Sequence, residues 1–139
     1  MVLTRSLVLF VLITVPAAAD CGHPVEIRFS PGSSSTDVEG ALARGDRDCF
    51  TLRARAGQKL ELTQPEPVDD NIAFQLYAPP WTVRRGGEGW AAAGHALPGA
   101  GETDDAAQFS GGLPLGGQYL IVVGTTRGSG IYRLHIAIH

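Results

Sequence analysis

The feature that most constrains the fold is a series of short segments in which apolar and polar residues alternate, separated by turns rich in glycine, proline and serine. Alternation with a period of two is typical of a strand with one buried face. No segment repeats its apolar residues with a sustained helical period. The pattern therefore predicts an all-β protein, an antiparallel β-sandwich of about seven or eight strands.

The last two predicted strands, 119–124 and 131–138, have the strongest patterns. Residues 30–37 (SPGSSSTD) are expected to form a turn. Further strands are predicted at 25–29, 38–42, 50–54, 59–63, 72–76 and, as an edge strand, 105–113. In the final strand the two predicted faces are Tyr132, Leu134, Ile136 and Ile138 on one side, and Arg133, His135 and His139 on the other.

Two connections between these strands have distinct signals. Ala56-Gly57-Gln58 predicts a hairpin turn between the strands at 50–54 and 59–63. The stretch APPW at 78–81 is expected to end the strand at 72–76, because proline does not continue a central strand. Residues 82–104 are then expected to form a long surface connection, with at most one short strand around Trp90.

The N-terminus has the features of a secretory signal peptide. Arg5 precedes an apolar run from Leu7 to Val15, and Ala17-Ala18-Ala19 provide a small-residue cleavage site. The run is shorter than the roughly 20 residues of a membrane span, so an uncleaved anchor is the less favoured alternative. We expect cleavage after Ala19 and a single periplasmic or secreted domain, 20–139. Asp20 before Cys21 argues against lipidation.

The charge of the expected mature chain excludes some partners. Loss of residues 1–19 removes Arg5 from the 11 basic side chains and none of the 14 acidic ones, which leaves a formal charge of −4. Basic residues are not clustered. The sequence therefore argues against binding to nucleic acids or to anionic membrane surfaces.

The only two cysteines, Cys21 and Cys49, lie in the exported part of the chain. In an oxidising compartment they are expected to form a disulfide. Closing a loop of about 29 residues stabilises the fold by roughly 3–4 kcal/mol in the chain-entropy model. Two free thiols are the alternative, and a metal site is weaker still because no histidine stands at a suitable spacing.

Signals for catalysis or for a cofactor are weak. Ser33-Ser34-Ser35 lie in a predicted turn without a nucleophile-elbow motif. His135 and His139 share a strand face but stand about 13–14 Å apart, too far for one metal ion. The acidic loop residues lack a calcium-ligand spacing. Trp81 and Trp90 are expected to cover the end of the sandwich, with a sugar-binding surface as the alternative. We therefore expect no enzymatic activity, no cofactor and no metal site.

Two blocks of the sequence resemble a known family. They are the predicted hairpin around Ala56-Gly57-Gln58-Lys59 and the stretch LPLGGQYLIVVGTTRG at 113–128 with the closing strand. Together they resemble the bacterial periplasmic inhibitors of g-type and i-type lysozymes, and also the wider set of pre-peptidase C-terminal-type β-sandwich domains. The resemblance implies a β-sandwich that binds a g-type or i-type lysozyme as its protein partner.

The candidate partner-binding residues are Tyr119, Thr126, Arg127 and Gly128. We expect Arg127 at the tip of a hairpin between the last two strands, where its planar guanidinium would bond a carboxylate in a lysozyme cleft. The alternatives are that Arg127 is a solvated turn residue and that Tyr119 belongs to the core. The alternative function is that of a non-catalytic accessory domain that binds envelope glycans or proteins.

Overall fold

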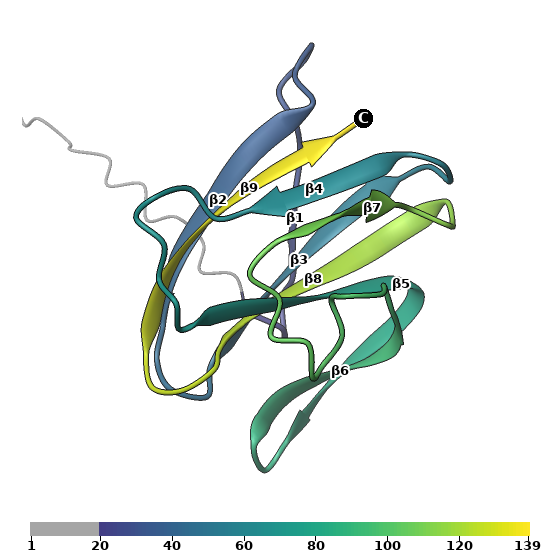
Figure 1. The fold of residues 1–139 in the computed structure, drawn as a ribbon. Helices are drawn as coiled ribbons and strands as arrows, with labels where there is room; N and C mark the ends of the chain where they lie inside the picture. Colours follow the sequence, from purple (N-terminus) through teal and green to yellow (C-terminus); the bar gives the residue numbers. More distant parts are fainter. Residues whose placement is uncertain (1–19) are drawn as a thin grey trace, which may run out of the picture.

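The computed structural model describes residues 20–139, so the predicted signal peptide at 1–19 lies outside the described residues. Within 20–139, nine strands form two sheets with the strand orders β1-β3-β8-β5-β6 and β2-β9-β4-β7 (Figure 1). This confirms an all-β sandwich. The strands are β1 (Val25–Glu26), β2 (Ser35–Leu42), β3 (Arg47–Ala54), β4 (Lys59–Thr63), β5 (Ile72–Gly86), β6 (Gly89–Ala96), β7 (Phe109–Gly112), β8 (Gly117–Thr125) and β9 (Gly130–Ile138).

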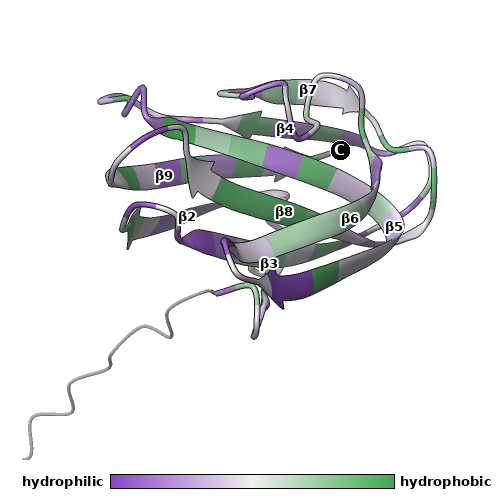
Figure 2. Cartoon of the chain, turned by 90° about the horizontal axis from the view of Figure 1, so that it is seen from below, coloured by the Kyte–Doolittle hydropathy of each residue, from purple (hydrophilic) through white to green (hydrophobic). Residues whose placement is uncertain are grey.

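The core lies between the two sheets and is built by the alternation seen in the sequence. In β9, Tyr132, Leu134, Ile136 and Ile138 are buried. Figure 2 shows β8 as hydrophobic over most of its length, in keeping with its place between β3 and β5 in the larger sheet. The other inward residues include Phe50, Leu52, Leu60, Leu62, Phe74, Leu76, Ile121 and Val123.

Two expected hairpins are instead connections between the sheets. β3 belongs to the five-stranded sheet, whereas β4 pairs with β7 and β9 in the four-stranded sheet. In the same way β8 and β9 lie in different sheets, so residues 126–129 cross from one sheet to the other. The prediction of hairpins was wrong because a short turn between two half-buried strands serves a hairpin and a corner of a sandwich equally well.

The region after Leu76 also differs from expectation. β5 continues through Pro79 and Pro80 to Gly86 and forms a long antiparallel pair with β6. The β5–β6 register shifts between Ala78 and Trp81, and β5 pairs with β8 only as far as Tyr77. The two prolines therefore stand where few ladder hydrogen bonds are required of them, at a bulge beyond the central part of the sheet.

The predicted turn at 30–37 is shorter than expected, because β2 begins at Ser35. At the N-terminus, β1 includes only Val25 and Glu26, and Ile27 extends the contact through its N–H to the Thr51 carbonyl (2.8 Å). With β5 and β6 as full strands, the described chain has nine strands in place of seven or eight.

The predicted disulfide between Cys21 and Cys49 is present, with a Cα–Cα distance of 4.6 Å. Both cysteines are buried with Tyr77, Leu120 and Val122 in a second apolar cluster, and Trp81 and Trp90 pack against it. The tryptophans thus cover the outer face of the five-stranded sheet rather than an end of the sandwich. No helix in the described part of the chain could cross a membrane.

Candidate binding surface at the β8–β9 connection

Arg127 lies in the short connection between β8 and β9, where the chain passes from one sheet to the other. Its side chain is exposed, and the ion pairs found within residues 20–139 do not include it. Gly128 has a φ of 66°, a left-handed conformation that glycine adopts at little cost. The Thr125 hydroxyl donates to the Gly128 carbonyl (2.8 Å), which closes the turn. The turn thus presents a guanidinium on a hydrogen-bonded backbone.

Asn71, immediately before β5, holds this turn through hydrogen bonds at four points. Its side-chain oxygen accepts from the Thr126 hydroxyl and from the Arg127 N–H, both at 2.8 Å. Its side-chain amide donates to the Ser129 carbonyl (2.8 Å), and its own carbonyl accepts from the Thr126 N–H (2.9 Å). Both ends of the turn are thereby fixed to the β5 side of the sandwich.

Asp69 extends this support to the first residues of β9. Its carboxylate accepts the Ile131 N–H and the Asn71 N–H, each at 2.9 Å. These two hydrogen bonds lower the pKa of Asp69, that from Ile131 being the larger cause. Asn71 and Asp69 are more than 50 residues from their partners in the turn, so no local sequence motif pointed to either of them.

Tyr119 does not lie near Arg127. It is fully buried, and its hydroxyl donates to the Leu115 carbonyl (2.7 Å) and accepts from the Leu115 N–H (3.0 Å). Thr125, at the end of β8, is six positions from Tyr119 along the strand, which corresponds to roughly 20 Å. The structure therefore brings Thr126, Arg127 and Gly128 together and places Tyr119 in the core near the opposite end of β8.

A hollow of about 630 Å³ adjoins the connection. Ile131 at the start of β9 has 73% of its surface exposed, the largest exposed fraction among the exposed large apolar residues that the structure describes. The alternation in β9 places Ile131 on the same outer face as Arg133 and His135, and this was the signal that could have singled it out. The residues that line the hollow are Pro67, Val68, Asp69, Asp70, Asn71, Arg127 and Ile131.

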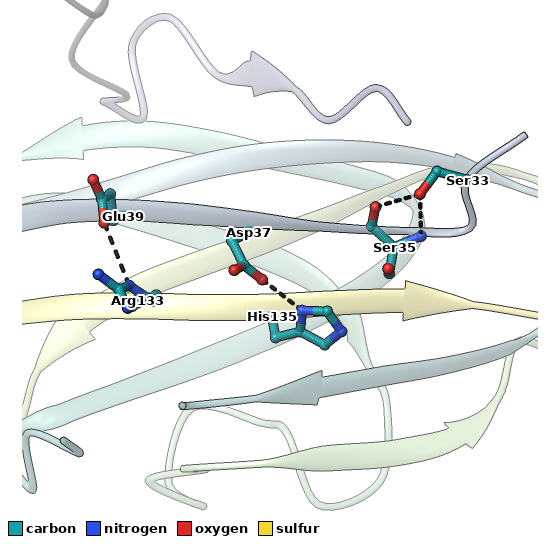
Figure 3. Close-up of polar contacts among 6 residues, drawn as sticks. All are labelled: Ser33, Ser35, Asp37, Glu39, Arg133 and His135. Carbon is teal, nitrogen blue, oxygen red and sulfur yellow. Dashed lines mark hydrogen bonds and ion pairs between the residues drawn. The ribbon is translucent and has the colours of Figure 1, made fainter. Parts of the chain in front are cut away.

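The polar outer face of the four-stranded sheet carries the residues considered for other chemistry (Figure 3). His135 pairs with Asp37 at 2.5 Å, and Arg133 pairs with Glu39 at 3.4 Å. The Ser33 hydroxyl donates to the Ser35 carbonyl (3.0 Å) and accepts from the Ser35 N–H (3.4 Å). In the part of the chain that the structure describes, no three His, Cys, Asp or Glu residues are grouped so as to hold a metal ion.

No family model matches the chain, and no curated protein matches it in sequence. Among solved structures, it is similar to PliG of Aeromonas hydrophila, described as a periplasmic lysozyme inhibitor of g-type lysozyme. The identity is 24%, the TM-score 0.60, and the match covers 84% of this chain and 96% of that one.

Two further solved structures with the same description are similar. PliG of Salmonella Typhimurium has 21% identity and a TM-score of 0.56, and a PliG mutant from Escherichia coli has 22% identity and a TM-score of 0.59. Each match covers 84% of this chain and 97% of the other. Over most of its length, therefore, the chain has the β-sandwich fold of the PliG proteins.

Proposed function

We propose that the mature protein, residues 20–139, binds and inhibits a g-type lysozyme in the periplasm. The observation that carries the proposal is an exposed arginine, Arg127, on a turn whose backbone is hydrogen-bonded in place, in a chain with the PliG fold. The expected signal peptide provides the route to the periplasm. In this function the protein acts by binding, without a catalytic step of its own.

The chemistry of the turn suits an acidic cleft. Lysozymes cleave glycosidic bonds with carboxyl groups in a cleft, and an arginine can bond a carboxylate through two parallel hydrogen bonds. Asn71 fixes the turn before binding, so little conformational entropy is lost when Arg127 enters the cleft. The formal charge of −4 on residues 20–139 also attracts basic lysozymes.

The test is a titration of purified protein 20–139 into lysis assays with c-, g- and i-type lysozymes. We expect inhibition of the g-type enzyme, and Arg127→Ala should weaken it by about 30- to 1,000-fold. Arg127→Lys should restore only part of the loss, because an ammonium lacks the planar fork. Arg53→Ala, at an exposed position in β3, is the matched control and should inhibit as the unmodified protein does.

Three results would contradict the proposal. If the protein inhibits none of the three lysozymes, the function is wrong, and binding to envelope glycans or other proteins becomes the function to test. If Arg127→Ala inhibits as well as the unmodified protein, the site is wrong. Inhibition of the i-type enzyme in place of the g-type would correct the class of partner.

A further inference from the structure

Two large apolar side chains are exposed beside the β8–β9 connection. Ile131 is 73% exposed and Val68 is 39% exposed, and Leu115 is the third such residue in the part of the chain that the structure describes. Single exposed apolar residues are common on protein surfaces. Ile131 and Val68, however, line the same hollow as Arg127, so these apolar groups converge on the candidate site.

Ile131 stands between two hollows. One, of about 630 Å³, includes Arg127 and Asp70 in its lining, and the other, of about 530 Å³, lies toward β2 and includes Glu39 and Glu66. Both are lined by Ile131 and by Pro67. We call the two hollows together the Ile131 groove. It runs from Arg127 past the start of β9 to the edge strand β2.

The sides of the Ile131 groove are mainly acidic. Four carboxylates, Glu39, Glu66, Asp69 and Asp70, and two guanidinium groups, Arg127 and Arg133, line it. Arg133 is paired with Glu39 at 3.4 Å. An apolar middle with carboxylates along its sides suits a cationic side chain that lays its aliphatic stem on Ile131 and its charge near an acid.

We infer that the Ile131 groove is a second contact region for the lysozyme, and that it receives basic side chains from the rim of the cleft that Arg127 enters. This inference rests on the proposed function. A basic protein with an acidic cleft presents both charges within a short distance. Arg127 and Asp70 line one hollow and Glu66 lines the next, so the groove offers groups complementary to both charges.

The size of a stable interface supports a second region. A standard interface buries about 800 Å² on each partner. Residues 126–129 form a narrow turn of four residues, and the adjoining Ile131 groove supplies a wider surface. Apolar groups near the centre of such a surface commonly dominate affinity, with charged groups at the rim setting the association rate.

The test measures binding of purified g-type lysozyme to protein 20–139 by surface plasmon resonance at low and high salt. Ile131→Thr keeps the β-branch that favours a strand and removes apolar surface. It should weaken binding about 10- to 100-fold, mainly through faster dissociation, with an unchanged melting temperature. Asp70→Asn and Glu66→Gln should each slow association several-fold at low salt, with a smaller effect at high salt.

Leu115→Thr is the matched control, because Leu115 is 48% exposed and lies beside Tyr119, away from the groove. It should bind as the unmodified protein does. If Arg127→Ala weakens binding but Ile131→Thr, Asp70→Asn and Glu66→Gln do not, the groove inference is overturned and the proposed function stands. If the unmodified protein binds no g-type lysozyme, the proposed function fails, and the inference that rests on it fails as well.

Discussion

At the scale of single residues, Asn71 decides how Arg127 is presented. Its side chain bonds Thr126, Arg127 and Ser129, which between them form most of the connection from β8 to β9. An asparagine supplies both an acceptor and a donor, so one side chain can satisfy an N–H, a hydroxyl and a carbonyl of the same turn. In the proposed function, Asn71 thus acts on the partner through Arg127, whose turn it holds in place.

Asn71→Ala should therefore weaken lysozyme inhibition by about 5- to 30-fold, because the turn must be ordered at the moment of binding. Hydrogen exchange should be faster at the Arg127 amide, which loses its acceptor. In an Arg127→Ala background, Asn71→Ala should weaken inhibition little further, as expected for coupled residues. Gln64→Ala, which removes a hydrogen bond to Ala107, is the control. Fully additive losses would show that Asn71 does not act through Arg127.

At the scale of elements, Tyr132 ties β9 to the opposite sheet. Its hydroxyl donates to the Asp48 carboxylate of β3 at 2.6 Å. Burial raises the pKa of Tyr132, and the bonded Asp48 adds to the rise. Burial also raises the pKa of Asp48, and the hydrogen bond from Tyr132 opposes that rise. The room for the ring depends on Gly40 of β2, where a Cβ would lie 2.6 Å from the Tyr132 hydroxyl.

Tyr132→Phe should lower the free energy of unfolding by about 1–2 kcal/mol at pH 7, because the half-buried Asp48 carboxylate loses its donor. Removing the bond raises the folded-state pKa of Asp48 further above the unfolded value of 3.8. Because the folded-state pKa of Asp48 lies above 3.8, the free energy of unfolding falls as the pH rises from 3.8 through the folded-state pKa. The loss of stability in Tyr132→Phe should therefore be smaller at pH 3 than at pH 7. Urea unfolding of both proteins at the two pH values measures this loss of stability. A loss that is larger at pH 3 would show that the Tyr132 hydroxyl does not stabilise the Asp48 carboxylate.

At the scale of the whole molecule, the disulfide fixes the N-terminal segment to the outer face of the five-stranded sheet. Cys21 lies beside the short strand β1, which pairs with β3 in parallel. Trp90 covers the disulfide between Cys21 and Cys49. Trp90 packs closely on Gly22, where a Cβ would lie 2.9 Å from its ring. The first described residues, from Asp20 to β1, are thereby part of the folded domain.

Replacing both cysteines, Cys21→Ala with Cys49→Ala, should lower the free energy of unfolding by about 2–4 kcal/mol, since the loop is no longer closed in the unfolded chain. Urea unfolding of the double variant and of the unmodified protein measures the difference. Inhibition should persist at temperatures where the variant is folded, because Arg127 lies in another connection. A mass two hydrogens higher for the unmodified protein under non-reducing conditions would show that the disulfide is absent.

The sequence by itself determined which residues face the core and where most strands lie. The alternation in 131–138 specified the buried face of β9, because a side-chain period of two leaves one choice of face once the apolar set is known. The presence of only two cysteines determined their pairing. The TTRG stretch was recognisable as a short polar connection, and Arg127 as its exposed charge.

Only the tertiary structure decided which strands are neighbours and what supports the candidate site. Apart from proline, every residue has the same backbone N–H and C=O groups, so a strand pattern does not identify its partner strand. The β8–β9 connection could therefore not be distinguished from a hairpin. The prolines of β5 were compatible with a strand only because the register shifts beside them. Asn71, Asp69 and Ile131 gained their roles from contacts made across long stretches of chain, which exist only after the two sheets have packed together.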